Sequence, residues 1–300
     1  MLVGCRRGAG PEQAGPRLRR RANRQRVHGH SPTRVRLRAL GLRPSKRLSQ
    51  SFLEDARVTS AIMRAARLEH TTEVLEVGSG LGVLTHRLAE VAGRVVAVEV
   101  DEHLADWLRT ELHRRNVTVC PADILKIDPS SFFERDFTVV ANLPYHITSP
   151  VLRHLLAVGP PFATRLVVMV QAEVADRIAA SPGQMSALAV IIQTQTRVTR
   201  VRRVPAAAFY PRPKVDSAVL LLEPLQDSER AIHRTELPEF AGLVRAGFKQ
   251  PRKTLANSLA DGLNSRKEET IERLSRAGID PSTRPQALAV DDWVRLFRTA

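Results

Sequence analysis

Cysteine and aromatic residues are scarce in this sequence. Only two of the 300 residues are cysteine, Cys5 and Cys120, and aromatic residues make up 4%. Two cysteines so far apart cannot build a disulfide framework or a thiolate metal site, so we expect a reducing compartment and predict no metal. No apolar run approaches the roughly 18 residues that a membrane-spanning helix needs. These absences favour a cytoplasmic protein without a membrane anchor.

Acidic residues are almost missing from the first 50 residues. That stretch holds 14 Lys or Arg and the single acid Glu12, a net charge of +13 (14 − 1), against +15 for the whole chain. Residues 1–35 are therefore predicted to form a basic, disordered arm that binds phosphate backbones. A solvated tail, a misplaced start codon and a mitochondrial transit peptide are the alternatives. The stretch lacks the apolar segment of a secretory signal.

The body of the chain alternates short β-branched runs with helical patterns between Arg57 and Pro224, which predicts βαβ units and a parallel sheet. The predicted strands are Val74–Val77, Arg94–Val98, Val117–Cys120, Phe137–Ala141 and Arg165–Val170, followed by an antiparallel edge hairpin of Thr194–Val204 and Ala218–Leu222. The predicted helices between them are Leu84–Val91, Leu104–Arg115 and Pro150–Leu156.

The pattern becomes wholly helical after Glu223. The predicted helices are Leu237–Phe248, Thr254–Leu263, Glu268–Ala277 and Asp291–Phe297. Hydrophobic residues make up 43% of the sequence, which is enough for a substantial core. We predict an α/β fold with a Rossmann-like domain over residues 36–224 and a small all-helical domain over residues 225–300, after the arm of residues 1–35.

A glycine-rich turn follows the first predicted strand, in the run Glu76-Val77-Gly78-Ser79-Gly80-Leu81-Gly82. Alternate glycines let a backbone turn sharply and approach a ligand closely. The dinucleotide fingerprint requires a glycine where this chain has Val83, so a pyrophosphate cofactor is disfavoured and a nucleoside cofactor without phosphates fits better. The alternative is a tight corner between strand and helix without a ligand.

Acidic residues end the next two strands. Glu99 follows about twenty residues after the turn, where an acid in Rossmann-type sheets accepts hydrogen bonds from ribose hydroxyls. Asp123 closes the third strand and is placed to accept a hydrogen bond from an adenine amino group. Either acid alone could be an ordinary surface residue. Together with the turn they lie at the edge where open α/β sheets bind ligands.

The fourth strand ends in Asn142-Leu143-Pro144-Tyr145. An aromatic amine is a poor nucleophile because its lone pair is delocalised into the ring. The Asn142 side-chain oxygen and a neighbouring backbone carbonyl can accept both amino hydrogens and so free the lone pair. Pro144 stiffens the turn, and Tyr145 offers a ring on which an extracted base can stack. The alternative is an ordinary turn with a half-buried tyrosine.

This tetrapeptide resembles the signature of adenine amino-methyltransferases, and the wider chain resembles the small-subunit rRNA adenine N6,N6-dimethyltransferases. Ser49–Asp55 is similar to the family segment ahead of the first helix. Phe209–Ser217 is similar to its late motif, and Gly247–Leu255 to the entry of its helical domain. The resemblance covers about residues 35–298, with the motifs in family order.

The resemblance implies dimethylation by S-adenosylmethionine of two adjacent adenosines in a hairpin near the 3′ end of 16S rRNA, during small-subunit assembly. It implies a monomer whose partner is ribosomal RNA. The implied catalytic residues are Asn142, Leu143, Pro144, Tyr145 and Phe209. The implied cofactor-binding residues are Gln50, Phe52, Leu53, Glu76, Gly78, Ser79, Gly80, Gly82, Glu99, Val100, Asp123, Ile124 and Asn142. The implied RNA contacts are Arg202, Arg203, Lys214, Arg252 and Lys253.

Two departures from the family pattern stand out. Pro251 precedes Arg252 where the family commonly has a further arginine, and His146 stands where it often has asparagine. Two other functions share the scaffold: a large-subunit methyltransferase of the macrolide-resistance type, and an RNA-binding or transcription factor that has lost catalysis. The C-terminal run from Ala277 to Pro285 looks more like the small-subunit enzymes, and the intact glycine turn and Asn142 argue against a retired site.

Overall fold

The computed structural model describes residues 33–45 and 47–299. The chain divides into two compact units, Met1–Pro44 and Ser45–Ala300. The described part of the first unit contains the helix α1 (Thr33–Ala39). The basic arm predicted for residues 1–35 lies almost wholly outside the described residues and stays a prediction.

The second unit is built on a seven-stranded sheet with the strand order β4-β3-β2-β5-β6-β9-β7. The strands are β2 (Glu73–Val77), β3 (Arg94–Glu99), β4 (Val117–Pro121), β5 (Phe137–Asn142), β6 (Ala163–Gln171), β7 (Thr196–Val204) and β9 (Ser217–Pro224). The first five run parallel, and β9 is antiparallel to both of its neighbours. The predicted parallel sheet with an antiparallel hairpin is confirmed, and β7 is the edge strand.

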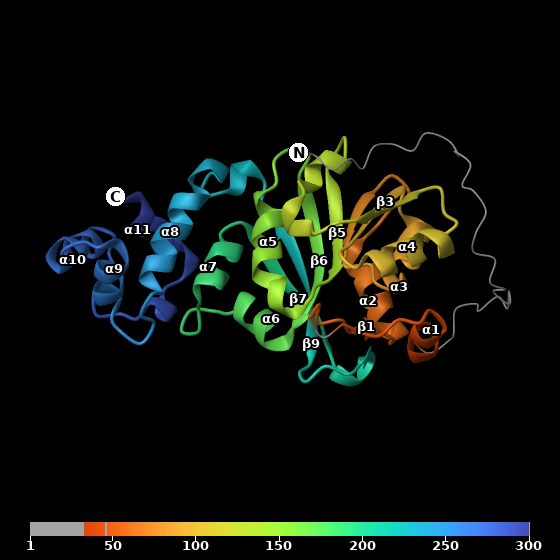
Figure 1. The fold of residues 1–300 in the computed structure, drawn as a ribbon. Helices are drawn as coiled ribbons and strands as arrows, with labels where there is room; N and C mark the ends of the chain where they lie inside the picture. Colours follow the sequence, from red (N-terminus) through yellow and green to blue (C-terminus); the bar gives the residue numbers. More distant parts are fainter. Residues whose placement is uncertain (1–32, 46, 300) are drawn as a thin grey trace. The chain divides into compact units, whose positions relative to one another are not determined.

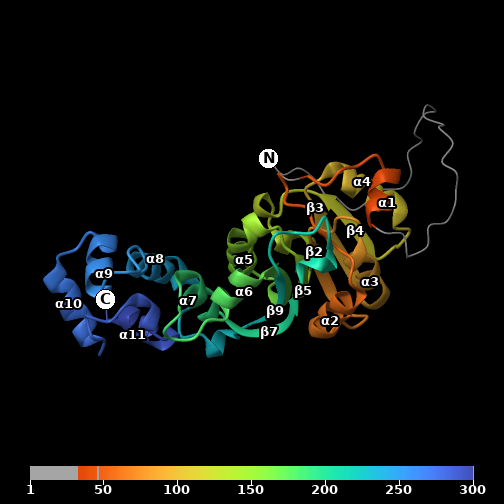
Figure 2. The same cartoon turned by 90° about the horizontal axis from the view of Figure 1, so that it is seen from below.

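Helices cover both faces of this sheet, as Figure 1 and Figure 2 show. One face carries α2 (Ala56–Ala66), α3 (Val83–Val91) and α4 (Glu102–Glu111), and the other carries α5 (Thr148–Ala157) and α6 (Ala172–Ile178). Successive side chains of a strand point to opposite faces. Val74 of β2 therefore belongs to the same hydrophobic cluster as Ile62 of α2, whereas its neighbour Leu75 belongs to the cluster that contains Leu152 of α5. The strands β2, β3, β5 and β6 are buried on both sides, which leaves the ends of these strands as the places open to ligands.

The prediction of a helix over Leu104–Arg115 was wrong at both boundaries. The observed helix α4 begins earlier, at Glu102, and ends earlier, at Glu111. The Asp101 side chain caps its start by accepting from the His103 and Leu104 amides. After the buried Leu112 come His113, Arg114 and Arg115, which have no apolar side chain to bury. The Asn116 side chain donates to two carbonyls at the end of α3, each at 3.0 Å, and this pins the turn.

A second hydrophobic cluster holds the C-terminal helices together. They are α8 (Leu237–Gly247), α9 (Leu255–Leu263), α10 (Lys267–Arg276) and α11 (Val290–Arg298). Trp293 is fully buried at its centre and stacks on Phe248 with ring centroids 5.4 Å apart. Gly247 lies against this ring, where a Cβ atom would come within 2.3 Å of it. The predicted helical region is confirmed.

The helices α2, α6 and α7 (Ala187–Gln193) and a small two-stranded sheet were not predicted. α7 precedes residue 225 but packs into the cluster of the C-terminal helices through Val190, so the exact boundary at residue 224 stays a proposal. The small sheet pairs β1 (Phe52–Leu53) with β8 (Phe209–Tyr210). Strands of two residues leave no alternation in the sequence from which they could be predicted. No described helix has both the length and the apolar character needed to cross a bilayer.

Candidate active site

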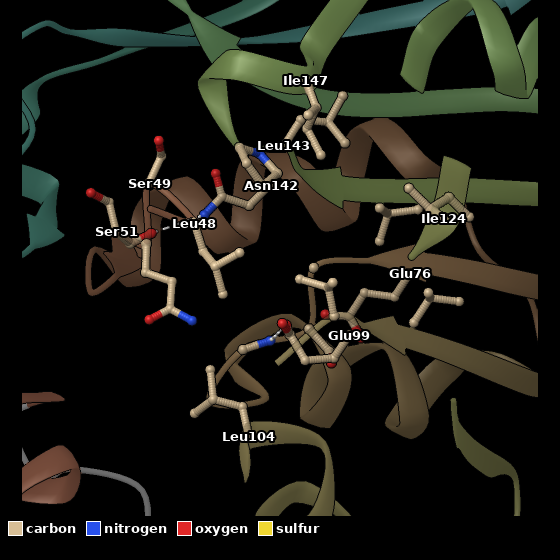
Figure 3. A pocket seen from close by; sticks show the side chains of 18 of the residues that line it. Leu48, Ser49, Ser51, Glu76, Glu99, Leu104, Ile124, Asn142, Leu143 and Ile147 are labelled. Atoms are coloured by element: carbon tan, nitrogen blue, oxygen red, sulfur yellow. Dashed lines mark hydrogen bonds between the residues drawn. The ribbon is translucent and has the colours of Figure 1, made fainter. Parts of the chain in front are cut away.

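A cavity of about 390 Å³ lies at the carboxyl ends of β2, β3, β4 and β5. The chain builds the sheet outward from β2 to β4 and then adds β5 on the other side of β2. Open α/β sheets bind ligands at such a switch point. Figure 3 shows the side chains that converge on this cavity from the sheet edge and from the segment around Ser49.

All the predicted catalytic residues and all but one of the predicted cofactor-binding residues line this cavity. The lining comprises Gln50, Phe52, Leu53, Glu76, Gly78, Ser79, Gly80, Glu99, Val100, Asp123, Ile124, Asn142, Leu143, Pro144, Tyr145 and Phe209. Several further lining residues were not predicted, among them Leu48, Ser49, Ser51, Leu104 and His146. Ser49, Ser51 and His146 lie in or beside the family-like motifs, but their residue types alone assign them no role in ligand binding.

The exception is Gly82, which is not among the lining residues. Its φ of +75° favours glycine, and it forms the N-terminal cap position of α3. A Cβ atom there would lie 2.6 Å from the Leu108 side chain. Gly82 therefore lets α3 pack closely against α4. The spacing of the glycines in the sequence could not show that Gly82 has this packing role and does not contact the ligand.

The other two glycines of the turn form the floor of the cavity. Gly78 has a φ of +76°, and a Cβ atom there would stand 3.3 Å from the Asn142 backbone oxygen. Gly80 has a φ of +52°, and its Cβ atom would stand 3.2 Å from the Phe52 ring. Any other residue at these positions would be strained, and its side chain would fill the cavity beside the backbone. The two glycines therefore fit a ligand that is held close to the backbone.

Glu99 is fixed by backbone donors at the end of β3. Its Oε2 atom accepts from the Gly80 amide at 2.7 Å, and its Oε1 atom accepts from the Asp101 amide at 3.0 Å. Burial raises the pKa of Glu99, and these two amides oppose the shift. Each carboxylate oxygen retains a second lone pair for a ligand hydroxyl. The geometry fits the predicted ribose contact.

Asp123 follows β4 and caps the short 3₁₀ turn of Ile124–Lys126 by accepting from the Leu125 amide at 3.1 Å. Its other carboxylate oxygen lies 3.9 Å from the Lys126 amine. Ile124 is buried beside it, while Val100 is 48% exposed, and both line the cavity. An apolar slot next to an acceptor fits a flat base with an exocyclic amine.

Glu76 is a buried carboxylate at the bottom of the cavity, and only 1% of its surface is exposed. Neither of its oxygens has a hydrogen-bond partner of normal geometry among the described residues, although Thr85 lies near enough to affect its pKa. Burial raises the pKa of Glu76 to about 8, and the negative charge of Glu99 acts in the same direction, whereas the Thr85 side chain opposes it. An orphaned buried acceptor of this kind fits a ligand that brings its own donors or positive charge.

Glu76→Gln is expected to stabilise the unliganded protein at pH 8 but not at pH 4. Between the unfolded pKa of 4.5 and the folded value of about 8, the folded state holds a proton that the unfolded state has lost, so stability falls as pH rises. An amide cannot ionise and escapes this loss. Thermal scans should give a Tm gain of roughly 3–8 °C at pH 8. Equal gains at both pH values would contradict the proposed burial effect, and the exposed Glu90→Gln serves as control.

Asn142 ends β5 with its side chain held in one orientation. The Nδ2 atom donates to the Ser51 carbonyl at 3.2 Å, as the dashed line in Figure 3 marks. Since a carbonyl can only accept, the amide oxygen must point the other way. The Pro144 carbonyl is occupied by the Ile147 amide and the Thr148 hydroxyl. The Leu143 carbonyl is therefore the neighbouring acceptor that could act together with the Asn142 oxygen.

Tyr145 and Phe209 supply aromatic walls. The Tyr145 hydroxyl pairs with the buried Ser217 hydroxyl at 2.8 Å, which fixes the ring. Burial raises the pKa of Tyr145, so its hydroxyl stays protonated at neutral pH. Phe209 is 4% exposed and is held by the pairing of β8 with β1. These rings can stack on a base but cannot act as its proton acceptor.

The predicted RNA-contacting residues lie on two separate parts of the surface. Arg202 and Arg203 are exposed on the edge strand β7, and Lys214 is exposed in the turn before β9. Arg252 and Lys253 are exposed between α8 and α9. Arg203 pairs with Asp216 at 3.3 Å. The other four have no carboxylate within ion-pairing distance in the described part of the chain.

Comparisons with known proteins point in one direction. Residues 41–300 match the family model described as ribosomal RNA adenine dimethylase. A relative from Moorella thermoacetica, named ribosomal RNA small subunit methyltransferase A, is 41% identical over 281 residues, which cover 88% of this chain and 94% of the relative. A relative of the same name from Anoxybacillus flavithermus is 39% identical over 280 residues, covering 89% of this chain and 94% of its own length.

Two solved structures of methyltransferases are also similar to this chain. A dimethyladenosine transferase from Plasmodium falciparum has a TM-score of 0.69 and 25% identity, covering 82% of this chain and 95% of its own. The 23S rRNA methyltransferase ErmE has a TM-score of 0.66 and 29% identity, covering 83% of this chain and 98% of its own. The similarity therefore extends over the sheet and the helical region together.

Proposed function

The chain belongs to the ribosomal RNA adenine dimethylase family, and from this premise we propose that it dimethylates the exocyclic amine of adenosine in small-subunit rRNA. S-adenosylmethionine is the methyl donor. The main support for this chemistry is the orientation of the Asn142 side chain. Its amide nitrogen donates to the Ser51 carbonyl, so its oxygen is left to accept a hydrogen bond from a substrate.

The cavity residues fit this methyl donor. Glu99 would hold the ribose hydroxyls, and Asp123 with Val100 and Ile124 would hold the adenine ring. The buried Glu76 side chain lacks a partner, which a hydrogen-bond donor or positive charge of the ligand would supply. Gly78 and Gly80 leave room for the ligand beside the backbone. When bound, S-adenosylmethionine supplies an electrophilic methyl group on a sulfonium sulfur. No metal is required for this chemistry.

The protein's part is to prepare the amine. The Asn142 oxygen and the Leu143 carbonyl accept hydrogen bonds from the two N–H groups of the amine. These bonds localise the nitrogen lone pair and direct it toward the methyl donor. Tyr145 and Phe209 hold the extracted adenine between them. Holding nucleophile and methyl group in line supplies much of the acceleration, since it replaces a bimolecular encounter.

The proposal of small-subunit rRNA rests on the relatives at 39–41% identity that carry that name. Purified enzyme with labelled S-adenosylmethionine should be incubated separately with small and large ribosomal subunits that lack the modification. We expect label in the RNA of the small subunit and its assembly precursors only. Label confined to the large subunit would reject the proposed substrate and support an activity like that named for ErmE.

We propose that RNA is held by Arg202, Arg203, Lys214, Arg252 and Lys253, of which only Arg203 pairs with a carboxylate in the described part of the chain. Such contacts to phosphates position an RNA without reading its bases. We further propose that the protein acts as a monomer in the cytoplasm, where its substrate would be assembled. The basic residues of the arm, of which only Arg34 is among the described residues, would add to the same attraction.

Arg252→Ala combined with Lys253→Ala is expected to weaken RNA binding mainly at low salt. A plot of log K against log salt has a negative slope, and losing two phosphate contacts should make this slope less steep by about two. We expect little change in kcat. Binding is measured by filter retention of small subunits over a salt series. Arg266→Ala is the matched control, because its guanidinium pairs with Glu269 and is already neutralised. An unchanged slope in the double variant would exclude these residues from the RNA contact.

A further inference from the structure

Ser217 is a buried polar residue at a position where the strand pattern predicts an apolar one. It opens β9, and the alternate residues Val219 and Leu221 belong to the hydrophobic cluster on the face of α2 and α3. Because side chains two residues apart in a strand share a face, the Ser217 side chain points to that same face. Ser217 is 0% exposed. A hydroxyl buried among apolar side chains costs free energy unless it has a partner, so its partner should account for its presence.

The partner is the Tyr145 hydroxyl, which lies 2.8 Å from the Ser217 hydroxyl across 72 residues of sequence. Tyr145 lies in the turn after β5, whereas Ser217 lies in β9, and β6 separates these two strands in the sheet. The Tyr145 side chain therefore extends over the end of β6 to reach its partner. The ring is held at both ends, by the backbone of the turn and by the bond at its hydroxyl.

Ser217 is itself firmly placed in the sheet. Its backbone pairs with β6 on one side and with β7 on the other. The preceding residue, Asp216, accepts from the Ala172 amide through its carbonyl at 2.9 Å and from the Ala206 amide through its carboxylate at 3.0 Å. A hydroxyl anchored in this way is a fixed point for the Tyr145 ring.

The same stretch of chain, residues 209–217, also carries the second aromatic wall of the cavity. Phe209 begins the stretch and is held in β8 by its pairing with β1, and Ser217 ends it. One stretch thus places both rings, Phe209 directly and Tyr145 through Ser217. The spacing between the two rings decides whether a flat purine can stack on them.

We propose that Ser217 is a positioning residue for methyl transfer, which holds the Tyr145 ring in place relative to Phe209 and so fixes the slot in which the extracted adenine stacks. The inference rests on the proposed function, since it assumes that a base enters this slot. Stacking follows RNA docking, which is assigned to exposed cations outside the cavity. The Ser217 bond should therefore affect the rate of the bound complex more than its affinity for RNA.

Ser217→Ala is expected to lower the single-turnover rate at saturating small subunits by about two- to tenfold, the effect of one hydrogen bond. The half-saturating concentration of small subunits and the Kd for S-adenosylmethionine should each stay within about twofold. Tyr145→Phe keeps the ring and removes the same bond from the other side, so its rate should fall to a similar degree. The combined variant should be no slower than the slower single variant, because all three lose one and the same bond.

Ser258→Ala is the matched control for a lost buried hydroxyl. Ser258 is also 0% exposed, and its hydroxyl accepts from the Gln250 amide at 2.9 Å and donates to the Ala246 carbonyl at 3.3 Å. It lies in α9 and does not line the cavity. Its loss should lower stability, as that of Ser217 should, but leave the single-turnover rate of the folded protein unchanged.

A spectroscopic measurement tests the bond without relying on activity. Tyr145 and Tyr210 are the only tyrosines of the sequence, so Tyr145 alone gives the phenol signal in a Tyr210→Phe background. The Raman doublet of a phenol reports the hydrogen bonding of its hydroxyl. We expect this doublet to change when Ser217→Ala is added and to stay the same when Ser258→Ala is added.

Three results would overturn the inference: an unchanged rate in Ser217→Ala, losses that multiply in the combined variant, or an unchanged doublet in Ser217→Ala. If Ser217→Ala does not fold, an unchanged rate in Tyr145→Phe decides against the inference in the same way. In each case the proposed function stands if the unchanged chain methylates the small subunit. If the unchanged chain methylates neither subunit, the proposed function fails and the inference fails with it.

Discussion

Asn142→Ala is expected to lower kcat for methyl transfer by about 10²–10³-fold, the usual loss when one fixed hydrogen-bonding group of a reacting centre is removed. The Asn142 oxygen is the proposed acceptor for an amine hydrogen, and without it the lone pair stays delocalised in the purine. Affinity for S-adenosylmethionine should fall by roughly tenfold or less, since only the bond to the Ser51 carbonyl is lost on that side. Single-turnover kinetics with small subunits and calorimetric titration of the donor measure the two effects separately.

Asn116→Ala is the matched control for this variant. Asn116 also donates its amide to backbone carbonyls, at 3.0 Å to Ala89 and Ala92, but it lies outside the cavity. Its loss should reduce stability by about 1–3 kcal/mol and leave kcat per folded molecule unchanged. If Asn142→Ala retained wild-type turnover, the oxygen of this side chain would have no part in the reaction.

Glu99→Ala is expected to raise the Kd for S-adenosylmethionine by about 10²-fold or more. A hydrogen bond to a charged group contributes about 1.5–3 kcal/mol, and two ribose hydroxyls would be released at once. The substitution also frees the Gly80 amide, which Glu99 holds at 2.7 Å, and so loosens the floor of the cavity. Calorimetric titration of the donor is the direct measurement.

Glu99→Gln separates these two contributions. The glutamine keeps one oxygen acceptor and the side-chain length but loses the charge, so its Kd should lie between those of the original chain and Glu99→Ala. Glu90→Ala, an exposed change on the neighbouring α3, should leave the Kd unaltered. A Kd within about twofold of the original in Glu99→Ala would mean that no ribose is bound at this carboxylate.

The sheet and most of the cavity were predictable because both follow from local patterns. β-branched runs predict strands, and the carboxyl ends of consecutive parallel strands meet at one edge. Glu99, Asp123 and Asn142 each end or follow a strand, so their convergence required only the strand order. The helical region was predictable for the same reason, since each of its four helices from Leu237 onward has its own helical pattern of apolar residues.

The rest depends on contacts between residues far apart in the chain. The bond from Asn142 to the Ser51 carbonyl spans 91 residues and that from Ser49 to His146 spans 97, and neither leaves a pattern in the sequence. Gly82 was grouped with Gly78 and Gly80 by spacing, yet the Leu108 side chain decides its role. The short helices α6 and α7 hold 7 residues each, too few for a helical period to stand out.

The most direct test of methyl transfer to adenine N6 is to identify the modified nucleoside itself. Unmethylated small subunits are incubated with the enzyme and deuterium-labelled S-adenosylmethionine, and their RNA is digested to nucleosides for mass spectrometry. We expect adenosine that carries two labelled methyl groups on N6, formed about 10²–10³-fold more slowly in the parallel reaction of Asn142→Ala. Label found only on a ribose hydroxyl or on another base would contradict the central claim.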